Sequence, residues 1–108
     1  MRTLKFIVED QIIKQDPNCD FSGLVPGSEG YLRAEFALSS EWREASAIVV
    51  SFWSDMGREY QPKVLNDDLT CTIPAEALEK RIFKIRLMGI TKDDKRLSTN
   101  KVTVEQNG

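Results

Sequence analysis

The stretch that decides the fold is residues 31–54, YLRAEFALSSEWREASAIVVSFWS. In its first part apolar and polar residues alternate, so that Leu32, Ala34 and Phe36 share one face of an extended strand. A strand with one apolar and one polar face is typical of an antiparallel sheet that is exposed to solvent on one side. The last part, residues 47–54, is rich in β-branched and aromatic residues and predicts a central strand.

Similar patterns extend in both directions from this stretch. Alternation bounded by turn residues predicts further strands at residues 3–9, 12–14, 59–61, 69–73, 81–91 and 96–104. Residues 39–44 begin with serines followed by an acid, which predicts a single helical turn. A short helix is expected from Pro74 to about Leu78, because proline is favoured at the first helical position. Residues 15–30 are rich in glycine and proline and predict a long loop.

These elements define the expected fold class. About eight short strands and two short helical turns in 108 residues predict an all-β fold, an antiparallel two-sheet β-sandwich of immunoglobulin-like or jelly-roll-like topology. No repeat, linker or low-complexity segment divides the sequence. Residues 1–108 are therefore expected to form a single β-sandwich domain.

Composition argues against several classes of function. The chain has 15 Lys and Arg against 17 Asp and Glu, a formal net charge of −2, and no histidine. The absence of histidine removes catalysis of the Ser-His-Asp and Cys-His kinds, so an enzyme is not expected. Cations are interspersed with acids, and the start of the chain is charged with no long apolar run. We therefore expect no nucleic-acid partner, no membrane association and no signal peptide.

Two cysteines and two pairs of acids raise the question of a metal site. Cys19 and Cys71 are far apart and belong to no CxxC motif, so reduced thiols are preferred to a disulfide or a zinc site. Cys71 alternates with Leu69 and Ile73, and all three are expected on a buried face.

The acid pairs are Asp67-Asp68 and Asp93-Asp94. Such pairs can contribute to a calcium site or to carboxylate catalysis, but aspartate also stabilises tight turns by binding nearby backbone groups. Turns are preferred here, because the spacing of an EF-hand is missing. We expect no catalytic, cofactor-binding or metal-binding residues, and no cofactor.

The aromatic residues leave two interpretations open. Trp42 and Trp53, together with Tyr31 and Tyr60, are candidates for a platform on which sugars stack. The alternative is packing, with Trp42 closing one end of the sandwich. Phe52 and Trp53 point to opposite faces of their strand, which would expose one of them. Packing is preferred for both tryptophans.

A family resemblance rests on four consecutive segments, LRAEFALSSEW, AIVVSFWS, VLNDDLTCTIPAEAL and KIRLMGITKDDKRLSTN. Together they resemble a small β-sandwich domain of tail, baseplate and receptor-binding-associated proteins in tailed phages and prophages of Gram-positive bacteria. The matching residues are Trp42, Phe52, Cys71, Ile73, Pro74, Glu76, Leu78, Gly89, Arg96, Thr99 and Asn100. One departure is the segment from Arg86 to Gly89, where many members have a G-x-Y/F-G motif.

The resemblance implies a non-enzymatic structural protein of the virion. It would act in the tail or baseplate through protein–protein contacts, with other tail proteins or a second copy of itself as partners. It would be synthesised in the cytoplasm of the host bacterium. The main alternative is a carbohydrate-binding module that recognises host cell-wall polysaccharide through exposed aromatic residues. A weaker alternative is a general bacterial adaptor of immunoglobulin-like fold.

Overall fold

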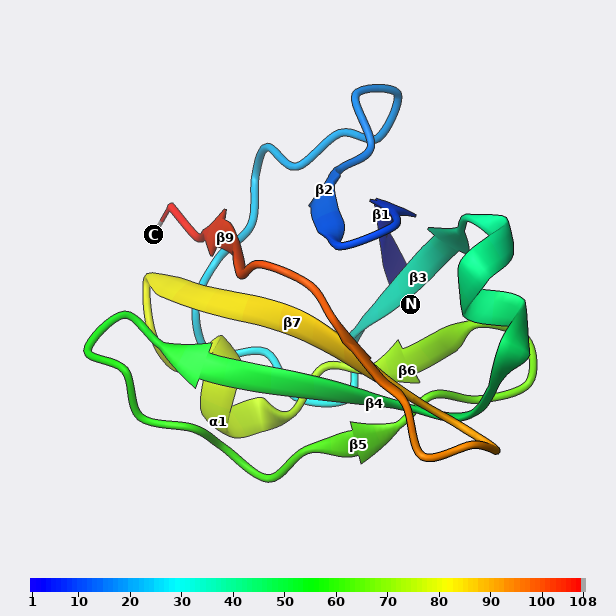
Figure 1. Ribbon diagram of the computed structural model, residues 1–108. Coiled ribbons are helices and arrows are strands. Elements are labelled where there is room, and N and C mark those ends of the chain that lie inside the picture. Colours follow the sequence, from blue (N-terminus) through cyan, green and yellow to red (C-terminus); the bar gives the residue numbers. More distant parts are fainter. Residues whose placement is uncertain (108) are drawn as a thin grey trace.

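The fold consists of two β-sheets, seen in a computed structural model that describes residues 1–107 (Figure 1). The strands are β1 (Arg2–Glu9), β2 (Ile12–Gln15), β3 (Leu32–Leu38), β4 (Ala45–Ser54), β5 (Lys63–Val64), β6 (Thr70–Thr72), β7 (Ile82–Thr91), β8 (Arg96–Ser98) and β9 (Val102–Glu105). A 3-10 helix, η1 (Ser40–Glu44), and one turn of α-helix, α1 (Ala75–Leu78), complete the chain. The predicted all-β two-sheet sandwich is confirmed.

The first sheet has the strand order β2-β1-β3-β6. Its pairings are antiparallel except for β1 and β3, which run parallel with Leu4 opposite Ala34 and Phe6 opposite Phe36. This pair departs from the expected antiparallel arrangement. Alternation fixes which face of a strand is buried, but it does not fix the direction of the neighbouring strand. Here β2 and the long loop that follows it return the chain to the end of the sheet where β1 began.

The second sheet has the order β5-β4-β7-β8, and β9 also pairs with β7. The long strands β4 and β7 form its centre, with Ser51 opposite Arg86 and Trp53 opposite Lys84. Two short strands share one edge of β7, since β9 pairs along its first half and β8 along its second half. The residues facing away from the other sheet form a partly solvated outer face.

The core lies between the two sheets. Its largest fully buried side chains are Trp42, Phe6, Phe36, Phe52, Phe83, Leu4, Ile13, Leu32, Ile73, Leu78, Ile85 and Leu87. The rings of Phe6 and Phe36 stack with centroids 5.5 Å apart, and Phe21 from the long loop meets Phe6 edge-on at 5.4 Å. Strand alternation therefore supplies both walls of the core, and the loop contributes a further apolar side chain.

Trp42 packs as expected from the sequence. It is 1 % exposed, and its indole Nε1 donates a hydrogen bond to the carbonyl oxygen of Asp10 at 2.8 Å. The ring lies against Gly89, where an added Cβ atom would be 3.1 Å from Cζ3 of Trp42. A glycine in β7 thus leaves room for the ring.

The strand expected at residues 59–61 is not formed. Only an isolated bridge joins Trp53 to Glu59, and β5 follows later in the sequence. Tyr60 still donates its backbone N–H to the carbonyl of Phe52 at 2.8 Å. Pro62 has no backbone N–H to donate, which is consistent with the interruption of pairing at this point.

The last strand, expected to run unbroken over residues 96–104, is divided into β8 and β9. Thr99 lies between them, and its Oγ1 accepts a hydrogen bond from the backbone N–H of Leu87 at 3.0 Å. Thr99 also donates its own N–H to the carbonyl of Leu87 at 3.0 Å. A side-chain oxygen therefore takes the place of a backbone carbonyl, and the ladder is interrupted there.

The expected strand over residues 69–73 begins one residue late. Cys71 and Ile73 are buried, as predicted, at 3 % and 0 % exposure, but Leu69 is 37 % exposed and the prediction for it is wrong. Leu69 has a φ of 64°, in the left-handed region, and donates its N–H to the carbonyl of Asn66. It therefore closes the preceding turn, and alternation begins only after it.

Candidate functional site

The two acid pairs lie in turns, as preferred from the sequence. Asp68 accepts hydrogen bonds from the backbone N–H and the hydroxyl of Thr70, at 3.2 and 2.6 Å. Asp93 accepts from the hydroxyl of Thr91 and lies 3.4 Å from the ammonium of Lys95. These bonds from the threonine hydroxyls are the main reason that the pKa of each carboxyl is lowered. Within residues 1–107, no three His, Cys, Asp or Glu side chains are grouped to hold a metal ion.

Both cysteines are free thiols. Burial raises the pKa of Cys71 to about 12, so this thiol stays protonated at neutral pH. Cys19 is half-buried in the long loop, where its sulfur accepts a hydrogen bond from the backbone N–H of Lys5 at 3.4 Å. The thiol of Cys71, protonated and buried, is therefore a poor nucleophile in the native protein.

Trp53 points outward from β4, whereas Phe52 is buried in the core, so one of the two faces away from the core as the alternation predicted. The ammonium of Lys101 lies 3.7 Å from the centroid of the indole and therefore covers one face of the ring. The guanidinium carbon of Arg86 lies 5.4 Å from the same centroid. Two N–H groups here, Nε1 of Trp53 and Nε of Arg86, are buried without a hydrogen-bond partner. A ligand could stack on the covered face only by displacing Lys101.

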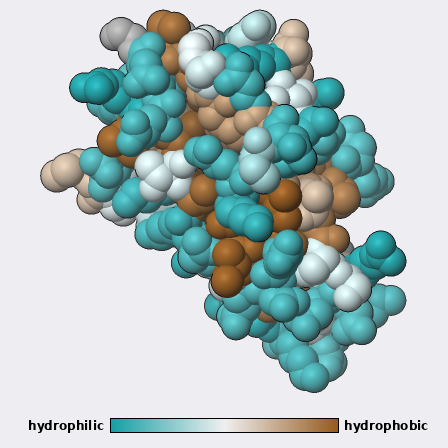
Figure 2. All heavy atoms as spheres, turned by 90° about the horizontal axis from the view of Figure 1, so that it is seen from above, coloured by the Kyte–Doolittle hydropathy of each residue, from teal (hydrophilic) through white to brown (hydrophobic). Residues whose placement is uncertain are grey.

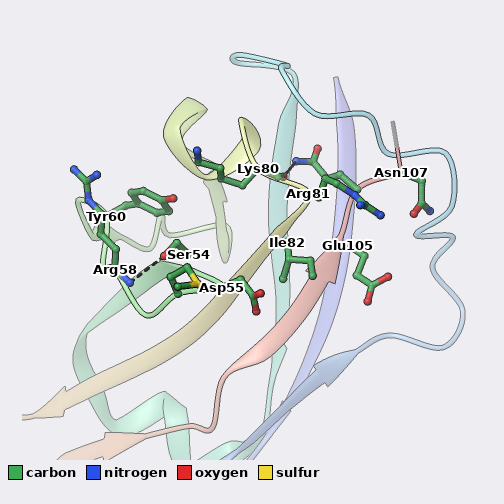
Figure 3. Close-up of a pocket in the computed structure, with 11 residues that line it drawn as sticks. Ser54, Asp55, Arg58, Tyr60, Lys80, Arg81, Ile82, Glu105 and Asn107 are labelled. Carbon is green, nitrogen blue, oxygen red and sulfur yellow. Dashed lines mark hydrogen bonds between the residues drawn. The ribbon is translucent and has the colours of Figure 1, made fainter.

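A groove of about 600 Å³ lies at one end of the sandwich. The end of β4 and the turn after it, within residues 54–60, form one side, and residues 80–82 and 105–107 form the other. Figure 3 shows this arrangement, with Arg58 and Tyr60 on one side and Ile82, Glu105 and Asn107 on the other. We call this feature the end groove. It brings together three segments that are distant in sequence.

Apolar and polar groups both line the end groove. Met56 is 94 % exposed at its lip, while Tyr60 is only 8 % exposed and Ile82 is half-buried. Gln106 is 1 % exposed and fixes the wall, since its Nε2 donates to the carbonyl oxygens of Leu78 at 2.9 Å and Lys80 at 2.8 Å. Its Oε1 is buried without a partner.

The charged side chains of the end groove are mainly cationic. Arg58, Lys80 and Arg81 belong to none of the ion pairs formed within residues 1–107. Of the two acids that line the groove, Asp55 lies 3.9 Å from the ammonium of Lys84 on the outer face of the second sheet. Lys84 lies opposite Trp53 in the sheet, so Asp55 connects the end groove to the residues around this indole.

Exposed apolar side chains also occur outside the end groove. The most exposed large ones besides Met56 are Met1, Val64, Ile12, Val25 and Tyr31. Ile12 lies in β2 and Val64 in β5, while Met1, Val25 and Tyr31 lie outside the strands. Figure 2 shows hydrophobic atoms interrupted by hydrophilic ones on the face seen from above. A second hollow of about 450 Å³ lies between η1, β4 and residues 64–69.

Fold and site define a two-sheet β-sandwich that carries an amphipathic groove at one end. No family model, curated protein or solved structure matches the chain. Within residues 1–107, no helix is both long enough and apolar enough to cross a membrane.

Sequence reasoning did not find the end groove. Lysines and arginines are scattered along the sequence among acids, and a pattern of this kind predicts no patch. The structure instead places Arg58 across one groove from Lys80 and Arg81, because the turn after β4 and the start of β7 line the same hollow. The dipeptide Lys80-Arg81 just after α1 was the only local signal.

Proposed function

We propose that the protein is a non-enzymatic structural protein of a phage virion, a tail, baseplate or receptor-binding-associated module that acts through protein–protein contacts. One observation carries this proposal. Eight of the eleven residues on which the family resemblance rests lie in the core or at contacts between strands. A motif made of framework residues is what a shared structural module would retain, whereas an enzyme family would share residues at a catalytic site.

Four pairs of motif residues have this framework role. The first pair is Trp42 and Gly89, which pack on each other at one end of the sandwich. Because Trp42 follows β3 and Gly89 lies in β7, their contact joins the first sheet to the second.

The other three pairs lie in the core and at the sheet edges. Cys71 and Ile73 belong to the buried core, as do Phe52 and Leu78. Thr99 pairs with the backbone of β7, and Asn100 pairs with the backbone of β2. These motif residues therefore contribute to the core between the sheets and to the contacts between strands.

A carbohydrate-binding module that recognises host cell-wall polysaccharide is the alternative. It is favoured by one observation, the outward orientation of Trp53 on β4. The cations against the indole weaken it, because Lys101 occupies a ring face that a sugar would need.

The test is the protein composition of virions. Particles induced from the source strain and purified by density gradient are analysed by mass spectrometry, with the major capsid protein as the positive control. We expect the protein in the particles at a fixed ratio to other tail proteins, and antibody-gold labelling at the tail. Detection in the lysate together with absence from intact particles would refute the proposal.

A further inference from the structure

From the end groove we infer a binding site for an acidic, extended peptide segment of a partner protein that carries an apolar side chain. The inference deepens the proposed function, on which it rests for the premise that the protein binds other proteins. Its test uses the isolated protein and no virion, so the two can fail separately.

The first argument is shape. A hollow of about 600 Å³ lies within the size range of ligand pockets and can hold one large side chain together with the backbone on either side of it. Because Gln106 is anchored to two carbonyl groups beside α1, the wall at the end of β9 is preformed. The other side is the turn after β4, whose Ser54 hydroxyl accepts a hydrogen bond from the backbone N–H of Arg58 at 3.0 Å. The site thus needs little rearrangement to receive a segment.

The second argument is the apolar side chain. Met56 extends almost entirely into solvent at the lip, although a large apolar side chain gains free energy when it is covered. Methionine is unbranched and flexible, and such residues adapt to different apolar partners. Ile82 provides the facing apolar surface across the groove. An apolar side chain of the partner would fit between the two.

The third argument is charge. Six cations surround the end groove and the adjoining outer face, namely Arg58, Lys80, Arg81, Lys84, Arg86 and Lys101. Four carboxylates lie in or beside this surface, namely Asp55 and Glu105 in the groove, Glu59 opposite Trp53, and Glu79 directly before Lys80. This surface is positive on a chain whose formal net charge is −2, so it attracts an anionic partner.

The mixture of charges favours an acidic peptide over a nucleic acid. Asp55 and Glu105 both line the end groove and would repel a continuous chain of phosphates passing through it. A peptide can instead place its carboxylates beside Arg58 and Arg81 and leave an uncharged residue beside each acid. It also supplies the apolar side chain that a phosphate backbone lacks.

The experiment measures fluorescence anisotropy with a labelled eight-residue peptide that repeats aspartate, glutamate and leucine. Two matched peptides replace the acids with lysine or the leucines with serine. We expect the acidic leucine peptide to bind and both matched peptides to bind at least about tenfold more weakly. Amide chemical shifts should change mainly in residues 54–60, 80–82 and 105–107.

Protein variants test the residues. Arg58→Glu and Arg81→Glu should each weaken binding roughly tenfold, because each replaces an attraction by a repulsion. Met56→Ser should weaken it without changing the charge. The control is Lys92→Glu, which makes the same charge change at the opposite end of β7, about 30 Å away for ten strand residues. Each substituted residue is exposed, and an unchanged melting temperature verifies the fold.

Three results would overturn the inference. One is that the acidic leucine peptide shows no binding at millimolar concentration, and another is that Lys92→Glu loses as much peptide affinity as Arg58→Glu and Arg81→Glu. The third is that the serine peptide binds with the same affinity as the leucine peptide. Equal affinity for an oligothymidylate of the same charge, with the same residues perturbed, would show a general polyanion site instead. None of these results would bear on whether the protein is present in virions.

Discussion

Asn100 pairs with both backbone groups of Ile13. Its Oδ1 accepts a hydrogen bond from the N–H of Ile13 at 2.8 Å, and its Nδ2 donates to the carbonyl of the same residue at 3.4 Å. Ile13 lies in β2, the edge strand of the first sheet, while Asn100 lies between two strands of the second sheet. The amide thus covers part of an open sheet edge and joins the sheets at that point.

Replacing this amide tests its contribution to stability. Asn100→Ala should lower the free energy of unfolding by about 1–3 kcal/mol, because the N–H of Ile13 loses its partner. Chemical denaturation in urea measures the change. Asn18→Ala is a matched control, since the side chain of Asn18 is exposed and makes no hydrogen bond within residues 1–107. Equal stability of the two variants would show that the amide is not important for stability.

The close contact of Gly89 with Trp42 makes a second prediction. In Gly89→Ala the new Cβ would lie 3.1 Å from the indole and 3.2 Å from the Cβ of Ala45, so the neighbours must move. We expect a loss of about 1–3 kcal/mol from this overpacking, and of about 3–5 kcal/mol in Trp42→Ala. Thermal and urea unfolding measure both.

A double variant separates this contact from other effects. When Trp42 is already alanine, both close contacts with the indole are gone and only the Cβ of Ala45 remains at 3.2 Å, so Gly89→Ala should cost less than in the native protein. Additive losses would contradict the contact. They would place the effect of the methyl group elsewhere, for example in the strand itself.

The strands were predictable from the sequence where alternation is strict. The stretch from Leu32 to Leu38 and the core-facing residues of β7 follow a period of two, and the structure has them as predicted. Period two gives the buried face of a strand but not its partner. The parallel pairing of β1 with β3 was therefore missed, because it depends on the path of a sixteen-residue connection, residues 16–31.

Other errors came from side chains that replace backbone groups. The hydroxyl of Thr99 takes a position in the β7 ladder, so the apparent single strand is divided.

The end groove was missed for a different reason. Its cations come from the turn after β4 and from residues beyond α1, and no local motif contains both. Only the tertiary arrangement creates the site.

The buried thiol of Cys71 gives a prediction about reactivity. A thiol whose pKa is raised to about 12 has almost no thiolate at pH 8, and this one is also inaccessible. Ellman's reagent should therefore leave Cys71 unmodified in the native protein and modify it after denaturation. Cys19→Ser isolates this thiol for the measurement. Rapid labelling of native Cys19→Ser protein would contradict the burial.

The raised pKa of Cys71 also makes the free energy of unfolding depend on pH. The folded state holds the Cys71 proton up to about pH 12, whereas the unfolded state releases it near the ordinary value of 9.0. Between these values the folded state binds more protons, so the stabilisation is complete below pH 9 and is lost as the pH rises. The stability advantage of the native protein over Cys71→Ala should shrink over this range by up to about 1.4 kcal/mol per pH unit. A constant difference would show that the thiol does not titrate differently on folding.

The final prediction concerns Trp53 and separates a structural module from a sugar-binding one. Lys101 and Arg86 lie against the indole, so we expect cell-wall polysaccharide from a Gram-positive host to leave the tryptophan fluorescence of the native protein unchanged. Trp53→Ala should cost about 1 kcal/mol, since the substitution removes cation–π interactions at a partly solvated face. Lys101→Ala uncovers one ring face and serves as the comparison. Saturable quenching in the native protein that disappears in Trp53→Ala would support carbohydrate recognition and refute a purely structural role, because stacking requires an accessible ring. Quenching confined to Lys101→Ala would instead show that the lysine side chain excludes sugars from the native indole.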